Sequence, residues 1–208
     1  MILTIGRQYG SGGREIGEKL AELLGYKFYD NEILSAAAES SGYSEGAVSQ
    51  YDERPGSSLI YSLYMTTTAA SSAGDMLPMN QKLAFAQFDA IRNMAKEDNC
   101  VFVGRCADYV LKDRSDLVSI FIHASAENRR RRVVDHYGVP EESVDKVIRK
   151  QDKQRKEYYS FFTHREWGAA TNYDLCVHSD FLGIDGTVEV LAAFVRYREK
   201  MLKEGLAK

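Results

Sequence analysis

A glycine-rich stretch at residues 6–15 follows directly on an apolar run at residues 1–5, and this pairing dictates much of the expected fold. The β-branched run predicts a buried strand, and Ile16, Leu20 and Leu24 recur with the spacing of a helix face. Strand, glycine-rich loop and helix are typical of a phosphate-binding site, because glycines let backbone N–H groups converge on an anion at the helix N-terminus. The residues that we expect at the phosphates are Gly10, Ser11, Gly12, Gly13, Arg14 and Glu15.

The loop resembles the Walker A pattern G-x-x-x-x-G-K-[ST] but lacks its lysine and its hydroxyl residue. If Gly13 is an extra residue, Arg14 replaces the lysine and Glu15 replaces the Ser or Thr that binds Mg²⁺. Without an extra residue, Gly13 itself occupies the lysine position. We prefer the first alignment, because it keeps a cation at the phosphates and a planar guanidinium can span two oxygens. The alternative interpretation is a glycine-rich turn with no ligand.

Length, charge and cysteine content restrict the function classes. The 208 residues suit one domain, with or without a sizeable insertion, and the net charge of -3 argues against a general nucleic-acid binder. Residues 129–156 hold ten Lys or Arg and five Asp or Glu, a local excess that suits a small polyanionic ligand. The three cysteines lack metal-site spacing and predict reduced thiols in a cytoplasmic protein. Because no apolar run approaches membrane-spanning length and the first strand begins at Met1, we expect neither a membrane span nor a signal peptide.

Polar residues follow two of the predicted strands. Asp30 ends the strand predicted at residues 26–29, and Arg105 follows the apolar run at residues 100–104, with Asp108 shortly after. The carboxyl ends of parallel strands form the ligand edge of an open α/β sheet, so we expect these side chains at the site. Asp30 could hold Mg²⁺ through water or accept from a substrate, or it could cap the next helix. Arg105 could fix a phosphate, or it could pair with Asp108 or cap a helix.

Two segments are candidates for covering the site. Residues 40–80 show weak periodicity, which is usual for a functional lid or an insertion. Residues 129–160 form a basic helical hairpin in which Arg155 shares a helix face with Asp152, and such a hairpin can close over a triphosphate. Four consecutive arginines at 129–132 cannot all face one way, so we expect one or two to point to the ligand. A solvated hairpin is the competing interpretation.

Further strands are predicted at residues 117–123 and 175–179, with helices between them that begin near Ser125, Pro140 and Asp185. Strands that alternate with helices predict an α/β fold with a mostly parallel central sheet and right-handed crossovers. His136, His164 and His178 lack partners at metal-ligand spacing, and we predict none of these three to bind a metal.

Four blocks of the sequence, residues 10–16, 24–30, 103–105 and 124–129, resemble the cytidylate kinase-like family, a branch of the P-loop nucleoside monophosphate kinases. The resemblance implies a three-layer P-loop NTPase fold across residues 1–208, with an acceptor-binding insertion at 40–80 and a helical lid at 129–160. It also implies that Asp30, Arg105 and Asp108 contact the acceptor nucleotide, and that Arg131, Arg132 or Arg155 grip the phosphates. The family's Gly-Arg-Asp block reads Gly-Arg-Cys here and has lost its acid at residue 106.

These inferences predict a kinase that moves the γ-phosphoryl group of ATP, with Mg²⁺, to a small acceptor such as CMP. The catalytic residues would be Arg14, Asp30, Arg105 and Arg155, because phosphoryl transfer needs positioning and charge stabilisation. Asp30 is also the predicted metal ligand. Two alternatives stay open, a non-catalytic phosphate-binding relative with a degenerate loop and a kinase for a non-nucleotide acceptor. We expect neither nucleic acid nor membrane as a partner, and a homodimer stays open.

Overall fold

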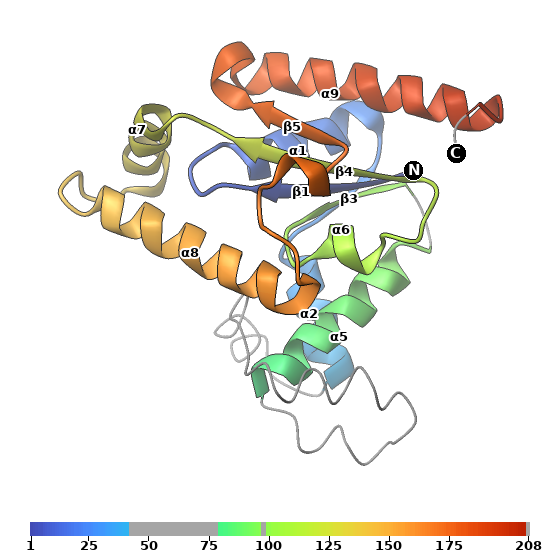
Figure 1. The fold of residues 1–208 in the computed structure, drawn as a ribbon, viewed down its shortest axis with the longest axis horizontal. Helices are drawn as coiled ribbons and strands as arrows, with labels where there is room; N and C mark the ends of the chain where they lie inside the picture. Colours follow the sequence, from blue (N-terminus) through green and yellow to red (C-terminus); the bar gives the residue numbers. More distant parts are fainter. Residues whose placement is uncertain (42–78, 97–98, 207–208) are drawn as a thin grey trace.

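The computed structural model of the chain describes residues 1–41, 79–96 and 99–206. Within them, five parallel strands form one sheet in the order β2-β3-β1-β4-β5 (Figure 1). The strands are β1 (Ile2–Arg7), β2 (Lys27–Tyr29), β3 (Cys100–Val103), β4 (Leu117–His123) and β5 (Leu175–His178). This arrangement confirms the predicted α/β fold with a parallel central sheet.

Burial explains why these segments are strands. All four residues of β3 are buried, and β1 lies between β3 and β4, where its own apolar run is covered on both faces. A central parallel strand needs such a continuous apolar run, because helices pack on both sides of it. In the register, Ile5 of β1 pairs with Val103 and with Ile120, so these strands end close together at one edge of the sheet.

Helices form a layer on each face of the sheet (Figure 1). One core joins α1 to α9 over β1 and β4, and it includes Leu20 and Leu191. The other core joins the sheet to α2, α5 and α6 through Ile33, Ile91 and Ala107. The helices are α1 (Gly13–Leu24), α2 (Glu32–Ser41), α5 (Met79–Met94), α6 (Ala107–Val110), α7 (Ala126–Tyr137), α8 (Val144–Thr163) and α9 (Ser179–Lys203), with a 3₁₀ turn at Ala170–Asn172. The three-layer architecture is therefore as predicted.

Most helix ends follow the sequence signals, and two differ. Ser125 caps α7 by accepting from the backbone N–H of Asn128 at 3.2 Å, as predicted. However, α8 begins at Val144 after a turn, not at Pro140. α9 begins at Ser179 and is interrupted at Gly183, whose φ of 67° is not helical. The predicted start near Asp185 therefore corresponds to the second part of α9.

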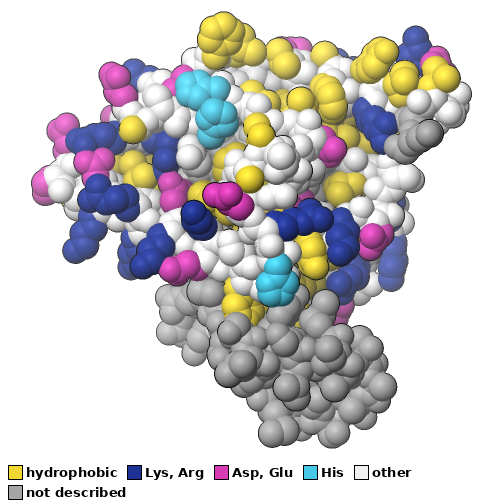
Figure 2. All heavy atoms as spheres, viewed as in Figure 1, with side chains coloured by type: hydrophobic (Ala, Val, Ile, Leu, Met, Phe, Trp, Pro, Cys, Tyr) yellow, Lys and Arg dark blue, Asp and Glu magenta, His cyan; other side chains and the backbone are white. Residues whose placement is uncertain are grey.

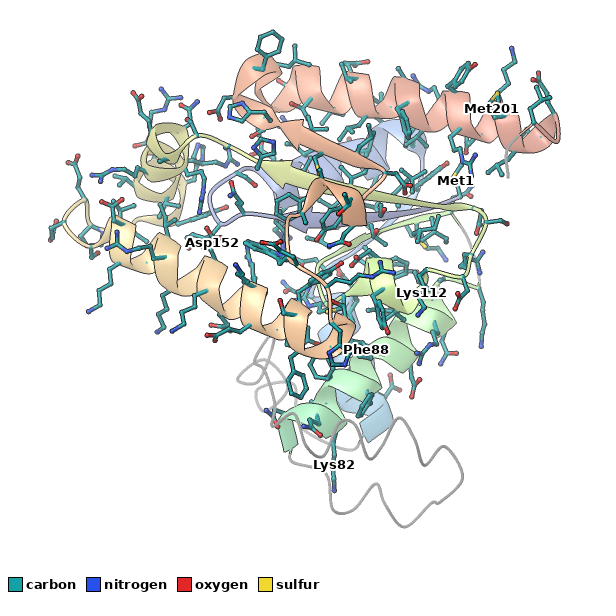
Figure 3. The ribbon with its side chains drawn as sticks, in the orientation of Figure 1. Met1, Lys82, Phe88, Lys112, Asp152 and Met201 are labelled. Carbon is teal, nitrogen blue, oxygen red and sulfur yellow. The ribbon has the colours of Figure 1, made fainter. Side chains whose placement is uncertain are left out.

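The two halves of α8 pack against different neighbours. Its C-terminal half is anchored through Tyr158 and Phe162 to Phe88 of α5, and the rings of Phe88 and Phe162 meet edge to face at 5.3 Å (Figure 3). Its N-terminal half contacts α7 through a smaller cluster around Val133 and Val144. Lys and Arg side chains gather on the side of the molecule where α7 and α8 lie (Figure 2). The lid at 129–160 stays a prediction, and most of the insertion at 40–80 lies outside the described residues.

None of the described helices combines the length and apolar character that crossing a bilayer requires. Cys100 and Cys106 are buried free thiols, and Cys176 is an exposed one.

The joint between α1 and α9 generates a stability prediction. Leu20 is fully buried in it, whereas Leu23 on the same helix is 40% exposed. Leu20→Ala should lower the free energy of unfolding by about 2–5 kcal/mol, because it removes buried apolar atoms and leaves a cavity. Urea unfolding measures this loss. Leu23→Ala is the matched control and should change the free energy by less than about 1 kcal/mol; equal losses in both variants would contradict the packing.

Candidate active site

The glycine-rich loop connects the end of β1 to the start of α1. Gly10 and Gly12 have φ angles of 79° and 77°, a left-handed conformation that favours glycine. A Cβ atom at Gly10 would also lie 2.9 Å from the carbonyl oxygen of Arg129, so there is no room for a side chain. Ser179 Oγ donates to the carbonyl of Ser11 at 2.8 Å and fixes the loop from α9. Among the described residues, no side chain caps the start of α1, so its first amides are available to a ligand over the loop.

An ion pair between α7 and α8 holds the tip of this loop. Arg129 and Asp152 form a salt bridge, and both are largely buried. Arg129 Nε donates to the carbonyl of Tyr9 at 2.7 Å, and the Tyr9 backbone N–H donates to Asp152 Oδ1 at 2.8 Å. Asp152 projects from α8 toward the loop (Figure 3). One residue pair therefore satisfies both backbone groups of Tyr9 and ties the helical hairpin to the loop.

Asp30, just beyond the end of β2, binds two arginines. Its Oδ1 accepts from Arg105 Nη1 at 2.5 Å and its Oδ2 accepts from Arg14 Nε at 2.8 Å. Asp30 is 7% exposed and Arg105 is 4% exposed. Burial by itself would raise the pKa of Asp30, but the charge and hydrogen bond of Arg105, then the hydrogen bond of Arg14, outweigh it and lower the pKa. Asp30 is a carboxylate held between two cations, and α2 begins two residues after it, at Glu32.

The turn after β3 holds Arg105 in an uncommon conformation. Gly104, Arg105 and Cys106 have consecutive positive φ angles of 78°, 51° and 55°. Such backbone costs about 1–3 kcal/mol at a non-glycine residue and often marks a functional position. It turns the Arg105 side chain back over the strand end, where Nη1 also donates to the carbonyl of Val103 at 3.0 Å. Arg105 therefore pairs with Asp30, not with Asp108.

Asp108 lies apart from this ion pair. Its carboxylate accepts from the Tyr159 hydroxyl at 2.7 Å, and burial raises its pKa although that hydrogen bond opposes the shift. Both residues line a narrow cavity that also contacts Arg105 and Arg155. The predicted acceptor contact of Asp108 stays a prediction.

Arg155 reaches the loop from α8. Its Nη1 donates to the carbonyl of Arg7 at 3.2 Å, and its guanidinium lies 5.6 Å from the centre of the Tyr9 ring. A pocket of about 300 Å³ opens beside these groups. Its lining brings together four predicted site residues, Arg14, Asp30, Arg105 and Arg155, with Gly10, Gly12 and Gly13 of the loop.

A second pocket of about 190 Å³ lies on the other side of the loop, and Gly10 lines both. Ser11, Arg131, Arg132 and Asp180 are among its lining residues. Within the described residues, the buried Nε of Arg132 has no hydrogen-bond partner. An unsatisfied buried donor of this kind is suited to an oxyanion.

The four arginines of α7 each have a polar partner. The partners are Asp152 for Arg129, Asp145 for Arg130, Asn128 for Arg131 and Glu15 for Arg132. Arg131 and Arg132 alone of the four line the second pocket. Glu15 lines neither pocket and pairs with Arg132 and Lys19, and its role at the cofactor stays a prediction.

The start of α1 bears on the two alignments of the loop. Gly12 is the N-cap and Gly13 is the first helical residue, so no extra residue separates the second glycine of the pattern from the helix. Arg14 directs its guanidinium to Asp30 and Glu18 and lies 5.7 Å from the centre of the Phe28 ring. This geometry favours the alignment in which Gly13 occupies the lysine position. It disfavours the alignment that we preferred from the sequence, in which Arg14 replaces the lysine.

Sequence reasoning missed several residues of the site. Arg7 lines the same pocket as Arg105, and it follows a strand in the same way, so the rule that identified Arg105 also identifies Arg7. Arg129 and Asp152 gave no such signal, because their pairing depends on how α7 packs on α8.

The residues present fit a polyphosphate better than they fit a metal. The glycine cradle, the amides of α1 and the buried Arg132 Nε all suit phosphate oxygens. Within the described residues, no group of three or more His, Cys, Asp or Glu could hold a metal. Each oxygen of Asp30 accepts a hydrogen bond from one arginine, and its role at Mg²⁺ stays a prediction.

The ion pair generates a prediction on stability and pH. Asp30→Asn leaves Arg105 buried without its counter-charge and should cost about 3–5 kcal/mol of unfolding free energy near neutral pH. Because the folded state lowers the pKa of Asp30, this stabilisation is present above the unfolded value near 3.9 and is lost as pH falls through the folded value.

The stability gap between wild type and Asp30→Asn should therefore narrow from about pH 7 to about pH 3, as measured by urea midpoints. Asp89→Asn removes an exposed pair with Arg92 and is the control, with an expected change within about 1 kcal/mol. A gap that stays constant across this range would contradict the charged state assigned to Asp30.

Known proteins resemble this chain in sequence and in fold. The model of the cytidylate kinase-like family matches residues 2–180. The crystal structure of an uncharacterized protein from Eubacterium ventriosum ATCC 27560 is 27% identical, with a TM-score of 0.70 over 94% of this chain and 98% of that chain. Shikimate kinase from Bacteroides thetaiotaomicron shares the fold. It is 12% identical, with a TM-score of 0.53 over 94% of this chain and 98% of that chain. No curated protein matches the sequence. The family match supports phosphoryl transfer in general and shows that the chain belongs to the cytidylate kinase-like family.

Proposed function

We propose that this protein is an ATP-dependent kinase whose acceptor is a nucleoside monophosphate such as CMP. The observation that carries the proposal is the pair of pockets that meet at Gly10, with a phosphate-binding loop between them. Two substrates placed on opposite sides of one loop can meet in line, and positioning supplies much of the acceleration in phosphoryl transfer.

The second pocket is the proposed donor side. Arg131 and Arg132 supply positive charge there, and Ser11 of the loop lines the same pocket. The amides at residues 10–14 would hold the donor phosphates at the start of α1, where the helix dipole favours an anion. ATP supplies the transferred phosphoryl group, with Mg²⁺ carried mainly on its phosphates and water.

The pocket around Asp30 is the proposed acceptor side. Arg105 would bind the acceptor's phosphate, and Asp30 would orient an acceptor group while it holds Arg105 and Arg14 in place. Arg155 reaches this pocket from α8, so closure of the hairpin at 129–160 would bring its charge onto the transferred group and exclude water. The free cysteines agree with a cytoplasmic protein, and small-molecule substrates suit pockets of this size.

One observation favours a second candidate, a non-catalytic phosphate-binding relative. Gly13 stands at the lysine position, and neither Arg14 nor Glu15 offers the hydroxyl that holds Mg²⁺ in the standard pattern. A turnover assay separates the two candidates.

ADP formation from Mg-ATP, measured across a panel of nucleoside monophosphates and small alcohols, tests the proposal. We expect turnover with a pyrimidine monophosphate. Arg105→Lys should raise the acceptor KM by about tenfold or more, because an ammonium group cannot reproduce the paired contacts of a guanidinium. Arg114→Lys alters an exposed arginine that pairs with Asp116 and should leave the kinetics unchanged.

ATP binding without turnover on any acceptor would favour the non-catalytic candidate. Turnover with an alcohol alone would replace the nucleotide acceptor. An unchanged KM in Arg105→Lys would remove Arg105 from the acceptor side.

A further inference from the structure

The start of α1 at Gly13 shows which position of the Walker A pattern Arg7 occupies. With Gly13 at the lysine position of G-x-x-x-x-G-K, the first glycine of the pattern falls on residue 7. This chain has arginine where the pattern has glycine, and glycine where the pattern has lysine. The small residue and the cation have exchanged places.

Steric exclusion explains why an arginine at residue 7 goes together with a glycine at residue 13. A Cβ atom at Gly13 would lie 2.5 Å from the Cβ of Arg7 and 3.2 Å from its Cγ, with Ile122 Cβ at 3.3 Å. Real Cβ atoms do not approach other carbons this closely, because repulsion rises steeply inside van der Waals contact. Gly13 is an ordinary helical residue, so backbone conformation does not require glycine there. The side chain of Arg7 excludes a side chain at residue 13.

The charge of Arg7 acts in the same pocket as the other site residues. Arg7 is the last residue of β1, pairs in register with Ile122, and is partly buried. Its side chain lines the 300 Å³ pocket together with Asp30 and Arg105. It is also one of the cations that lower the pKa of Asp30. Arg155 binds its carbonyl, which links it to the hairpin.

Arg14 is the other cation near the loop, but its bonds assign it a different task. It holds Asp30 Oδ2 through Nε and Glu18 through Nη1, and its side chain is 51% exposed. Arg14 thus positions Asp30 from the helix side. Arg7 lies on the strand side, against the backbone from which the standard lysine would extend.

We propose that Arg7 is the phosphate-binding cation of this loop and does from the strand end what a lysine at residue 13 does in the standard pattern. The proposal rests on the proposed function, because it needs the loop to bind the polyphosphate of a nucleoside triphosphate. Since Arg7 lines the acceptor-side pocket, the phosphate that it would contact is the terminal one, where the donor meets the acceptor. A guanidinium can contact two phosphate oxygens at once, so the exchange conserves charge and adds a second hydrogen bond.

The first test isolates the charge of Arg7. Arg7→Met keeps the Cβ and Cγ that fill the space beside Gly13, and it removes only the cation. It should weaken binding of ATP, and of inorganic tripolyphosphate as a second probe, by about 10- to 100-fold in calorimetry at fixed salt. Arg7→Lys should retain an intermediate affinity, because it keeps the charge without the planar fork. Arg114→Met is the matched control and should bind as wild type does.

The second test restores the standard pattern. Gly13→Lys alone should lower the melting temperature or prevent folding, because its Cβ collides with Arg7. The double variant Arg7→Gly/Gly13→Lys removes that collision and should recover most of the ATP affinity that Arg7→Gly loses. If the double variant does not fold, the comparison of Arg7→Met with Arg7→Lys still decides the role of the charge.

The outcomes distinguish the two proposals. Wild-type turnover with unchanged ATP and tripolyphosphate affinity in Arg7→Met would overturn the role of Arg7 and leave the kinase proposal standing. A wild type that binds neither ATP nor tripolyphosphate would overturn both. Weaker binding in Arg7→Met with partial retention in Arg7→Lys supports the exchange.

Discussion

The buried ion pair between Asp30 and Arg105 is the interaction on which the site depends. It joins the ends of β2 and β3, and it is possible because the turn after β3 accepts left-handed backbone at Arg105. A buried pair of this kind adds little net stability, because desolvation offsets its Coulomb attraction. Removing either partner is nevertheless costly, so the pair fixes the position of both groups. The strained turn and the buried charge of Asp30 together hold the guanidinium of Arg105 at the pocket.

The hairpin of α7 and α8 is hydrogen-bonded to the phosphate loop at two points. Arg129 and Asp152 hold Tyr9 near its tip, and Arg155 holds the carbonyl of Arg7 at its start. Because the C-terminal half of α8 is packed into a core with α5, movement of the hairpin would concentrate in its N-terminal half. Hairpin position and loop conformation are therefore physically coupled through these hydrogen bonds.

The sequence predicts the sheet and the strand-end residues because both depend on local patterns. Apolar runs identify the strands, and a polar residue at the end of a parallel strand must lie at the ligand edge, which places Asp30 and Arg105. Side-chain partners are different, because Arg132 meets Glu15 across 117 positions of sequence and only packing brings them together. The helix start disfavours the loop alignment that we preferred, for a related reason. We chose that alignment because it keeps a cation at the lysine position. The close contact between Arg7 and residue 13 arises only in the folded structure, so the sequence alone does not reveal it.

The balance of charge in the larger pocket argues for an anionic occupant. Its described lining carries four arginines, at residues 7, 14, 105 and 155, and a single carboxylate, Asp30. The carboxylate of Asp30 fixes two of these guanidinium groups, those of Arg14 and Arg105, by direct hydrogen bonds. Two guanidinium groups are thus held in place by Asp30 before any ligand arrives, and a phosphate is the kind of anion that they can bind. Since electrostatic stabilisation is strongest where donors need not reorganise, the arginines held by Asp30 and by the hairpin are suited to the developing charge of phosphoryl transfer.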